Sequence, residues 1–175
     1  QIDADYRLIT REIERFAGRE LLSATTTVHW GEATLDGVRA LRAEGVKVLA
    51  GYFLFQKGEP VVSYYLDTPR IEHLMGRDYW KDTKEDVIFV RHDLVVNTLP
   101  LDQIVPHLEK VAADPHQAEL MELMIHEQYF YPDYRNYQPD FRQRVERTIE
   151  WATKKGYEST LCDFGEESCA PPVRK

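Results

Sequence analysis

One stretch of the sequence indicates the fold most clearly: Leu120-Met121-Glu122-Leu123-Met124-Ile125-His126-Glu127. Its apolar run has the length and composition of a buried strand, and the run ends at a histidine. In folds built from parallel strands and helices, ligands bind at the carboxyl ends of the strands. We therefore expect His126 and Glu127 to be catalytic residues. A core histidine beneath an aromatic lid is the alternative explanation.

An aromatic loop follows this histidine. Four of the ten tyrosines lie within the next eleven residues. Flat rings that carry hydroxyl groups suit a sugar ring or another polar ligand. We expect the substrate, a carbohydrate or another small polar molecule, to contact Tyr129, Tyr131 and Tyr134 of this loop, together with Trp30 at an earlier strand end.

Strand and helix patterns alternate along the rest of the chain. Strands are predicted over 23–30, 46–55, 61–66, 86–97, 120–125 and 157–162. Helices are predicted between Asp5 and Gly18, from Leu35 to Gly45, from Leu101 to Pro115 and from Pro139 to Gly156. Pro106 should cause a kink in the third of these. One or two helical turns are predicted in 70–80. This order predicts an α/β fold with a mainly parallel sheet and flanking helices, in a single domain over 1-175.

Composition and charge exclude several classes of function. The net charge of -8, from 30 acidic and 22 basic side chains, disfavours binding to nucleic acid or to an anionic membrane. No apolar run approaches the roughly 18 residues of a membrane span, and residues 1–20 do not form a signal peptide, so we expect a soluble chain. Cys162 and Cys169 alone cannot complete a four-ligand zinc site, and both a local disulfide and two free thiols remain open.

Histidine occurs at three predicted strand ends. His29 follows a threonine-rich strand, His92 stands beside Asp93, and His126 stands beside Glu127. Imidazole and carboxylate groups can either hold a divalent metal such as Zn²⁺, which activates water, or pass protons without a metal. His29 and His92 are the candidate metal ligands and Asp93 is a further candidate catalytic residue, although a polar pair that ends a strand would also explain His92 and Asp93. We expect His29, Asp93 and His126 to converge in one cleft.

Three segments, in order along the chain, resemble the later part of polysaccharide deacetylase-like proteins: Ile13-Glu14-Arg15-Phe16-Ala17-Gly18, Thr25-Thr26-Thr27-Val28-His29-Trp30-Gly31 and Glu122-Leu123-Met124-Ile125-His126-Glu127. This resemblance spans most of the chain. It implies part of a distorted (β/α) barrel and an enzyme that removes acetyl groups from amino sugars with a divalent metal and water. It also implies that His126 acts as a catalytic acid, because Ile125-His126 is similar to a pattern at a late strand of that family.

The sequence departs from this family in its metal motifs. The family's paired aspartates end a first strand, whereas Asp3 and Asp5 precede a helix, and Ala33 occupies the position four residues after His29 where a second histidine is expected. Either N-terminal strands that carry the metal site are missing, which is our expectation, or this branch has altered its chemistry. We therefore expect an open sheet edge or an uncovered apolar face, which missing strands or a second copy in a homo-oligomer would cover.

Together these observations predict a carbohydrate-active hydrolase of polysaccharide deacetylase type, which removes acetyl groups from an amino sugar by water attack. The alternative from another class is a non-catalytic carbohydrate-binding or assembly domain, which would keep the aromatic residues and need no metal. A serine esterase is disfavoured, because no serine lies in a glycine-flanked nucleophile elbow.

Overall fold

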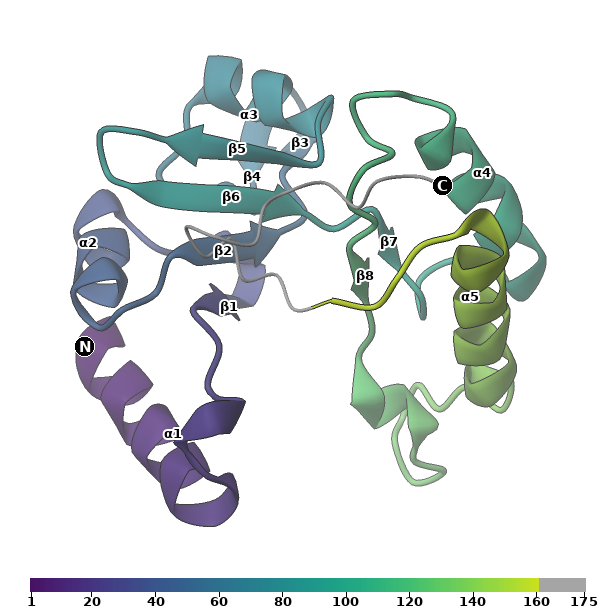
Figure 1. Cartoon of the computed structure of the whole chain (residues 1–175), viewed down its shortest axis with the longest axis horizontal. Coiled ribbons are helices and arrows are strands. Elements are labelled where there is room, and N and C mark those ends of the chain that lie inside the picture. Colours follow the sequence, from purple (N-terminus) through teal and green to yellow (C-terminus); the bar gives the residue numbers. More distant parts are fainter. Residues whose placement is uncertain (161–175) are drawn as a thin grey trace. The chain divides into compact units, whose positions relative to one another are not determined.

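The computed structural model describes residues 1–160, which group into two compact units, Gln1–Arg91 and His92–Thr160 (Figure 1). The single domain over 1-175 stays a prediction, and Cys162 and Cys169 lie outside the described residues. Within the described part of the chain, no helix is both long and apolar enough to cross a membrane.

The first unit is built on a four-stranded sheet. Its strands are β1 (Thr25–Thr27), β2 (Val48–Gly51), β6 (Val87–Arg91) and β5 (Tyr79–Asp82), in that spatial order (Figure 1). β1, β2 and β6 are parallel, and β5 is antiparallel to β6. The prediction of a mainly parallel sheet with flanking helices is confirmed. Among the described residues this sheet is open, with β1 and β5 at its edges.

Three helices accompany the sheet, and the sequence explains where two of them begin. α2 (Leu35–Ala43) starts after Thr34, whose hydroxyl accepts a hydrogen bond from the N–H of Gly37. α3 (Thr68–Met75) starts after Asp67, which caps the N–H of Arg70 in the same way. α1 (Ile2–Ala17) ends before Gly18 as predicted but begins at Ile2 rather than near Asp5.

The core of the first unit surrounds Phe89, which is fully buried on β6. Four aromatic rings lie with their centroids 5.6–6.1 Å from its ring: Phe53, Tyr64, Tyr65 and Trp80. Trp80 lies on β5, a strand that the sequence reading placed in a helical segment. Its stacking on Phe89 and the pairing of β5 with β6 explain why tertiary contacts prevail there over a weak local pattern.

The predicted strand over 46–55 is interrupted. β2 ends at Gly51, Phe53 adopts a left-handed φ of 51°, and β3 (Leu54–Gln56) then pairs in antiparallel fashion with β4 (Glu59–Val61). The strand predicted over 61–66 was wrong in its bounds, because β4 covers Glu59–Val61. Lys57 and Gly58 both have positive φ and form a two-residue turn, so that Glu59 and Pro60 already belong to the returning strand.

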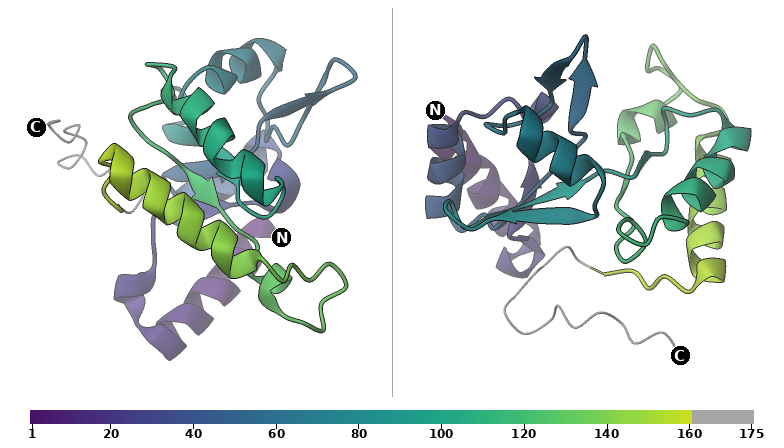
Figure 2. Two further views of the ribbon diagram at one scale, coloured as in Figure 1. Left: turned by 90° about the vertical axis from the view of Figure 1, so that its right-hand side faces the viewer. Right: turned by 90° about the horizontal axis from the view of Figure 1, so that it is seen from above.

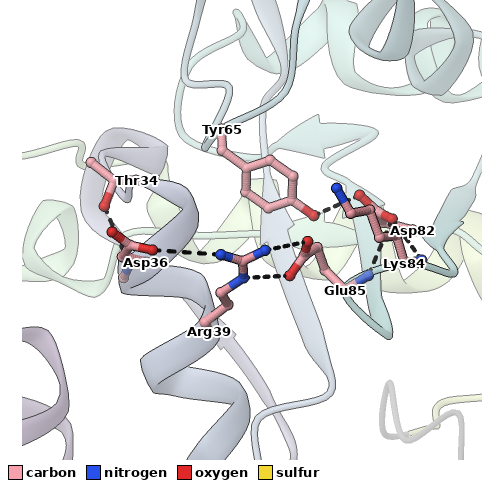
Figure 3. Close-up of polar contacts among 8 residues, drawn as sticks. Thr34, Asp36, Arg39, Tyr65, Asp82, Lys84 and Glu85 are labelled. Atoms are coloured by element: carbon pink, nitrogen blue, oxygen red, sulfur yellow. Dashed lines mark hydrogen bonds and ion pairs between the residues drawn. The ribbon is translucent and has the colours of Figure 1, made fainter.

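A polar network ties α2 to the turn between β5 and β6 (Figure 3). Arg39 on α2 binds both carboxylate oxygens of Glu85, at 2.7 and 2.8 Å. Asp82, the last residue of β5, accepts hydrogen bonds from the Tyr65 hydroxyl at 2.8 Å and from the N–H groups of Lys84 and Glu85. Burial acts to raise the pKa of Asp82, but these hydrogen bonds outweigh it and leave the pKa lowered.

The second unit contains a two-stranded parallel pair and two helices. β7 (Leu94–Val95) pairs with β8 (Leu123–Met124). α4 (Ile104–Ala112) and α5 (Phe141–Lys155) lie side by side in Figure 2, and their core residues include Ile104, Leu108 and Trp151. The predicted kink at Pro106 was wrong, because α4 begins at Ile104 and the proline falls in its first turn, where no N–H donor is lost.

The predicted strands of this unit are shorter than expected. β8 holds only two half-buried residues instead of 120–125, since β7 alone pairs with it among the described residues. Gly156 ends α5 in the left-handed conformation, as predicted, but 157–160 form no strand. Tyr157 instead stacks on Trp151 and donates a hydrogen bond to the carbonyl of Ala118.

An uncovered apolar surface lies on α1. Ile2 and Tyr6 pack against the core of the first unit. Farther along the same helix, Ile9 and Phe16 are 58% and 88% exposed. The helical spacing of these residues places them on one face of α1. The expected open edge or uncovered face concerned the sheet, whose outer strands among the described residues are β1 and β5.

Candidate functional site

The carboxyl ends of β7 and β8 place Asn97 beside His126. Because the two strands are parallel, the residues that follow them meet at the same end of the pair. Asn97 is buried, and its Oδ1 accepts a hydrogen bond from the backbone N–H of His126 at 3.0 Å. The same oxygen lies 3.0 Å from Nδ1 of the His126 ring. His126 thus occupies a strand end, as predicted, and is held there by a residue that the sequence reading did not single out.

This geometry fixes the protonation of the neutral imidazole. The backbone N–H of His126 can only donate, so the Asn97 atom that faces it is the carbonyl oxygen. That oxygen has no proton to give, and Nδ1 must therefore carry the hydrogen. Nε2 is left with its lone pair and forms no hydrogen bond within residues 1–160. A half-buried imidazole of this kind can accept a proton at Nε2 and return it.

Two of the predicted tyrosines lie next to this imidazole. The ring of Tyr129, in the short helix η4 (Glu127–Phe130), is centred 6.0 Å from that of His126, and the ring of Tyr134 is 5.3 Å from that of Tyr129. Gln138 holds the loop closed, because its side chain donates to the carbonyl of Asn97 at 2.8 Å and its N–H donates to that of Tyr129 at 2.9 Å.

Tyr131 and Glu127 are placed differently. Tyr131 is 54% exposed and its ring contacts Phe130, not His126. Glu127 directly follows the histidine and is exposed, and it has neither a hydrogen bond nor an ion pair in the part of the chain that the structure describes. Their roles in binding and catalysis stay predictions.

Asp93 and His92 lie at the opposite, amino end of the strand pair. Asp93 precedes β7, is buried, and accepts a hydrogen bond from the N–H of Glu122 at 2.9 Å. His92 contacts the Glu122 carboxylate through Nδ1. His107 bonds to the Asp93 carbonyl at 2.7 Å. Asp93 and His126 are therefore not brought together, which corrects the expected convergence of these two residues. A break in the predicted 86–97 strand explains it: β6 ends at Arg91, and Asp93 lies directly before the start of β7 instead of at a strand's carboxyl end.

His29 and Trp30 belong to the first unit. They lie in the short helix η2 (His29–Gly31), both are exposed, and their rings are 5.9 Å apart. Within residues 1–160 no three His, Cys, Asp or Glu residues gather in a group that could hold a metal ion. Metal binding by His29 and His92 stays a prediction.

Comparison with known proteins found no relative of this chain. No family model matches the chain, and neither curated proteins nor solved structures give a significant match. The resemblance to polysaccharide deacetylase-like proteins thus has the three segments quoted above as its only basis.

Proposed function

We propose that this chain is a carbohydrate-active hydrolase of polysaccharide deacetylase type, which removes acetyl groups from an amino sugar, with His126 as the proton carrier. One observation supports this most directly: Asn97 Oδ1 binds both the backbone N–H and Nδ1 of His126. The imidazole is thereby held in one tautomer and one orientation, with Nε2 available to a substrate.

The proton transfers follow from that tautomer. Nε2 takes a proton from the water molecule whose oxygen bonds to the acetamide carbonyl carbon. The carbon–nitrogen bond then breaks, and the departing nitrogen receives the proton from Nε2. Acetic acid and an amine are formed, and the acid gives its proton to the amine to leave acetate and an ammonium group. Asn97 stabilises the transient imidazolium, because its carbonyl oxygen already accepts the hydrogen on Nδ1.

The tyrosine rings beside His126 suit the sugar part of such a substrate. Tyr129 and Tyr134 are half-buried and offer aromatic faces with hydroxyl groups at their edges. Glu127 is the nearest carboxylate in sequence, and we propose that it contacts the polar groups of the substrate.

Acetate release from an N-acetylglucosamine oligomer tests the proposal with three proteins: wild type, His126→Ala and His116→Ala. His116 is exposed and serves as the matched control. We expect His126→Ala to lose about 10²- to 10⁴-fold in rate while His116→Ala keeps full activity. Full activity of His126→Ala would contradict the assignment. If wild type binds the oligomer but releases no acetate, the non-catalytic carbohydrate-binding function replaces the hydrolase.

A further inference from the structure

The first unit contains an open groove of about 1030 Å³ that no step of the proposed reaction uses. Its lining comes from two segments, 30–35 after β1 and 54–65 around the β3–β4 hairpin. Trp30 forms part of the lining and is 59% exposed. Large aromatic side chains left this exposed in a concave surface are typical of ligand contacts.

The backbone around the groove is held in an unusual conformation. Trp30, Val62 and Tyr64 all have left-handed φ angles, of 56°, 53° and 53°. This conformation is a genuine outlier for a β-branched residue such as Val62. Backbone strain of this kind gathers at ligand sites, where the surrounding structure enforces it.

Close contact between the two segments enforces the strain here. Gly31 adopts a φ of 58°, and a Cβ atom at this position would come within 2.9 Å of the Val62 carbonyl carbon. The N–H of Tyr64 donates to the Gly31 carbonyl at 2.9 Å, and its hydroxyl donates to that of Ala50 at 2.7 Å. The groove is therefore formed before any ligand binds.

The charges of the lining favour a neutral or cationic ligand. Its polar side chains include Thr34, Gln56 and Ser63. Among the lining residues that the structure describes, Glu32 is the one carboxylate, and there is no lysine or arginine. Glu32 is exposed and has no ion pair within residues 1–160. The hydroxyl of Tyr65, another lining residue, is turned to Asp82 (Figure 3). An aromatic face and an unpaired carboxylate both attract an ammonium group.

We infer that this groove binds the sugar chain itself and prefers residues that carry a free amine, with one ring on the face of Trp30 and the ammonium attracted by Glu32. The inference deepens the proposed function, because free amines are what acetyl removal produces. The groove would then retain a partly deacetylated chain and not only its acetylated precursor.

Calorimetric titration tests this with two probes, a glucosamine tetramer in weakly acidic buffer and an N-acetylglucosamine tetramer. The full chain carries His126→Ala so that the acetylated probe is not turned over; the glucosamine tetramer has no acetyl group to lose. We expect the glucosamine tetramer to bind more tightly and Trp30→Ala to weaken both probes by about tenfold or more. Phe16→Ala, which removes an exposed ring from α1, should change neither.

Glu32→Gln removes the negative charge of this side chain and keeps its size and shape. It should weaken the glucosamine tetramer and leave the N-acetylglucosamine tetramer unchanged. Binding that survives Trp30→Ala, or an equal effect of Glu32→Gln on both probes, would overturn the inference. Because these measurements need no turnover, groove binding without acetate release would reject only the proposed hydrolase, and acetate release without groove binding would reject only this inference.

Discussion

Asn97 Oδ1 lies 3.0 Å from both the backbone nitrogen and Nδ1 of His126. A single buried oxygen thus sets the position of the main chain and the tautomer of the side chain at the carboxyl end of β8. The two functions can be separated by mutation, since only one of the two donors belongs to the imidazole.

Asn97→Ala should cost about 2–3 kcal/mol of unfolding free energy, because it leaves the N–H of the half-buried His126 without its acceptor. His126→Ala keeps the backbone N–H and its acceptor, removes the ring hydrogen bond and the ring contact with Tyr129, and should cost about 1 kcal/mol. Urea unfolding of both variants measures the difference. Equal costs would show that the backbone hydrogen bond contributes little to holding β8.

Gly31→Ala should destabilise the chain more than Gly58→Ala. Both glycines have positive φ, so both changes carry backbone strain of about 1–2 kcal/mol. Only at Gly31 does the new Cβ meet backbone atoms, whereas the space around Gly58 is open. We expect an additional cost of about 1–3 kcal/mol at Gly31, seen as a lower thermal midpoint. The same midpoint for both variants would mean that the Trp30 and Val62 segments can separate freely.

Tyr65→Phe should reduce stability near neutral pH by about 1–2 kcal/mol, because the ionised Asp82 loses a hydrogen-bond donor. The folded-state pKa of Asp82 lies below its ordinary value of 3.8, so its contribution is complete above that pH and is lost as the pH falls through the lowered pKa. The difference in unfolding free energy between wild type and Tyr65→Phe should therefore become smaller below pH 3.8. Urea unfolding across this range, with the exposed Tyr137→Phe as control, provides the measurement. If this difference in unfolding free energy does not change with pH, the lost stability comes from packing and not from the hydrogen bond to Asp82.

Phe89→Ala and Phe16→Ala form a contrasting pair. Phe89 is fully buried among four rings, and its truncation should cost about 3–5 kcal/mol. Phe16 is 88% exposed at the end of α1, and its truncation should change stability by less than about 0.5 kcal/mol. A large loss at Phe16, measured at several protein concentrations, would show that another surface covers α1.

The sequence predicted the element types better than their ends. The apolar core of β6 and the glycines after α1 and α5 were strong local signals, and the structure confirms these elements. β5 was missed because its main stabilisation is long-range, from the stacking of Trp80 on Phe89 and from its pairing with β6. The break between β6 and β7 was missed because the apolar residues 87–90 and 94–96 are separated by only three polar residues, Arg91, His92 and Asp93, so that the pattern indicates one strand.

The candidate site was also predicted only in part, because local sequence patterns indicate some of its residues and not others. A histidine after an apolar run can be recognised from the sequence alone, and so can the tyrosines that follow it. Asn97 and Gln138 carried no such signal, because their function depends on pairing across 29 and 41 residues of chain. The expected meeting of Asp93 with His126 failed because a strand end and a strand start look alike in sequence.

The shortness of β7 and β8 has a consequence for how this chain can vary. With two residues in each strand, the main-chain ladder does little to fix the site, and side chains at positions 97, 126 and 138 hold it instead. These three positions are therefore coupled: a chain that lost the acceptor at 97 would gain little by keeping the histidine at 126. We expect diverging copies of this sequence to change them as a set.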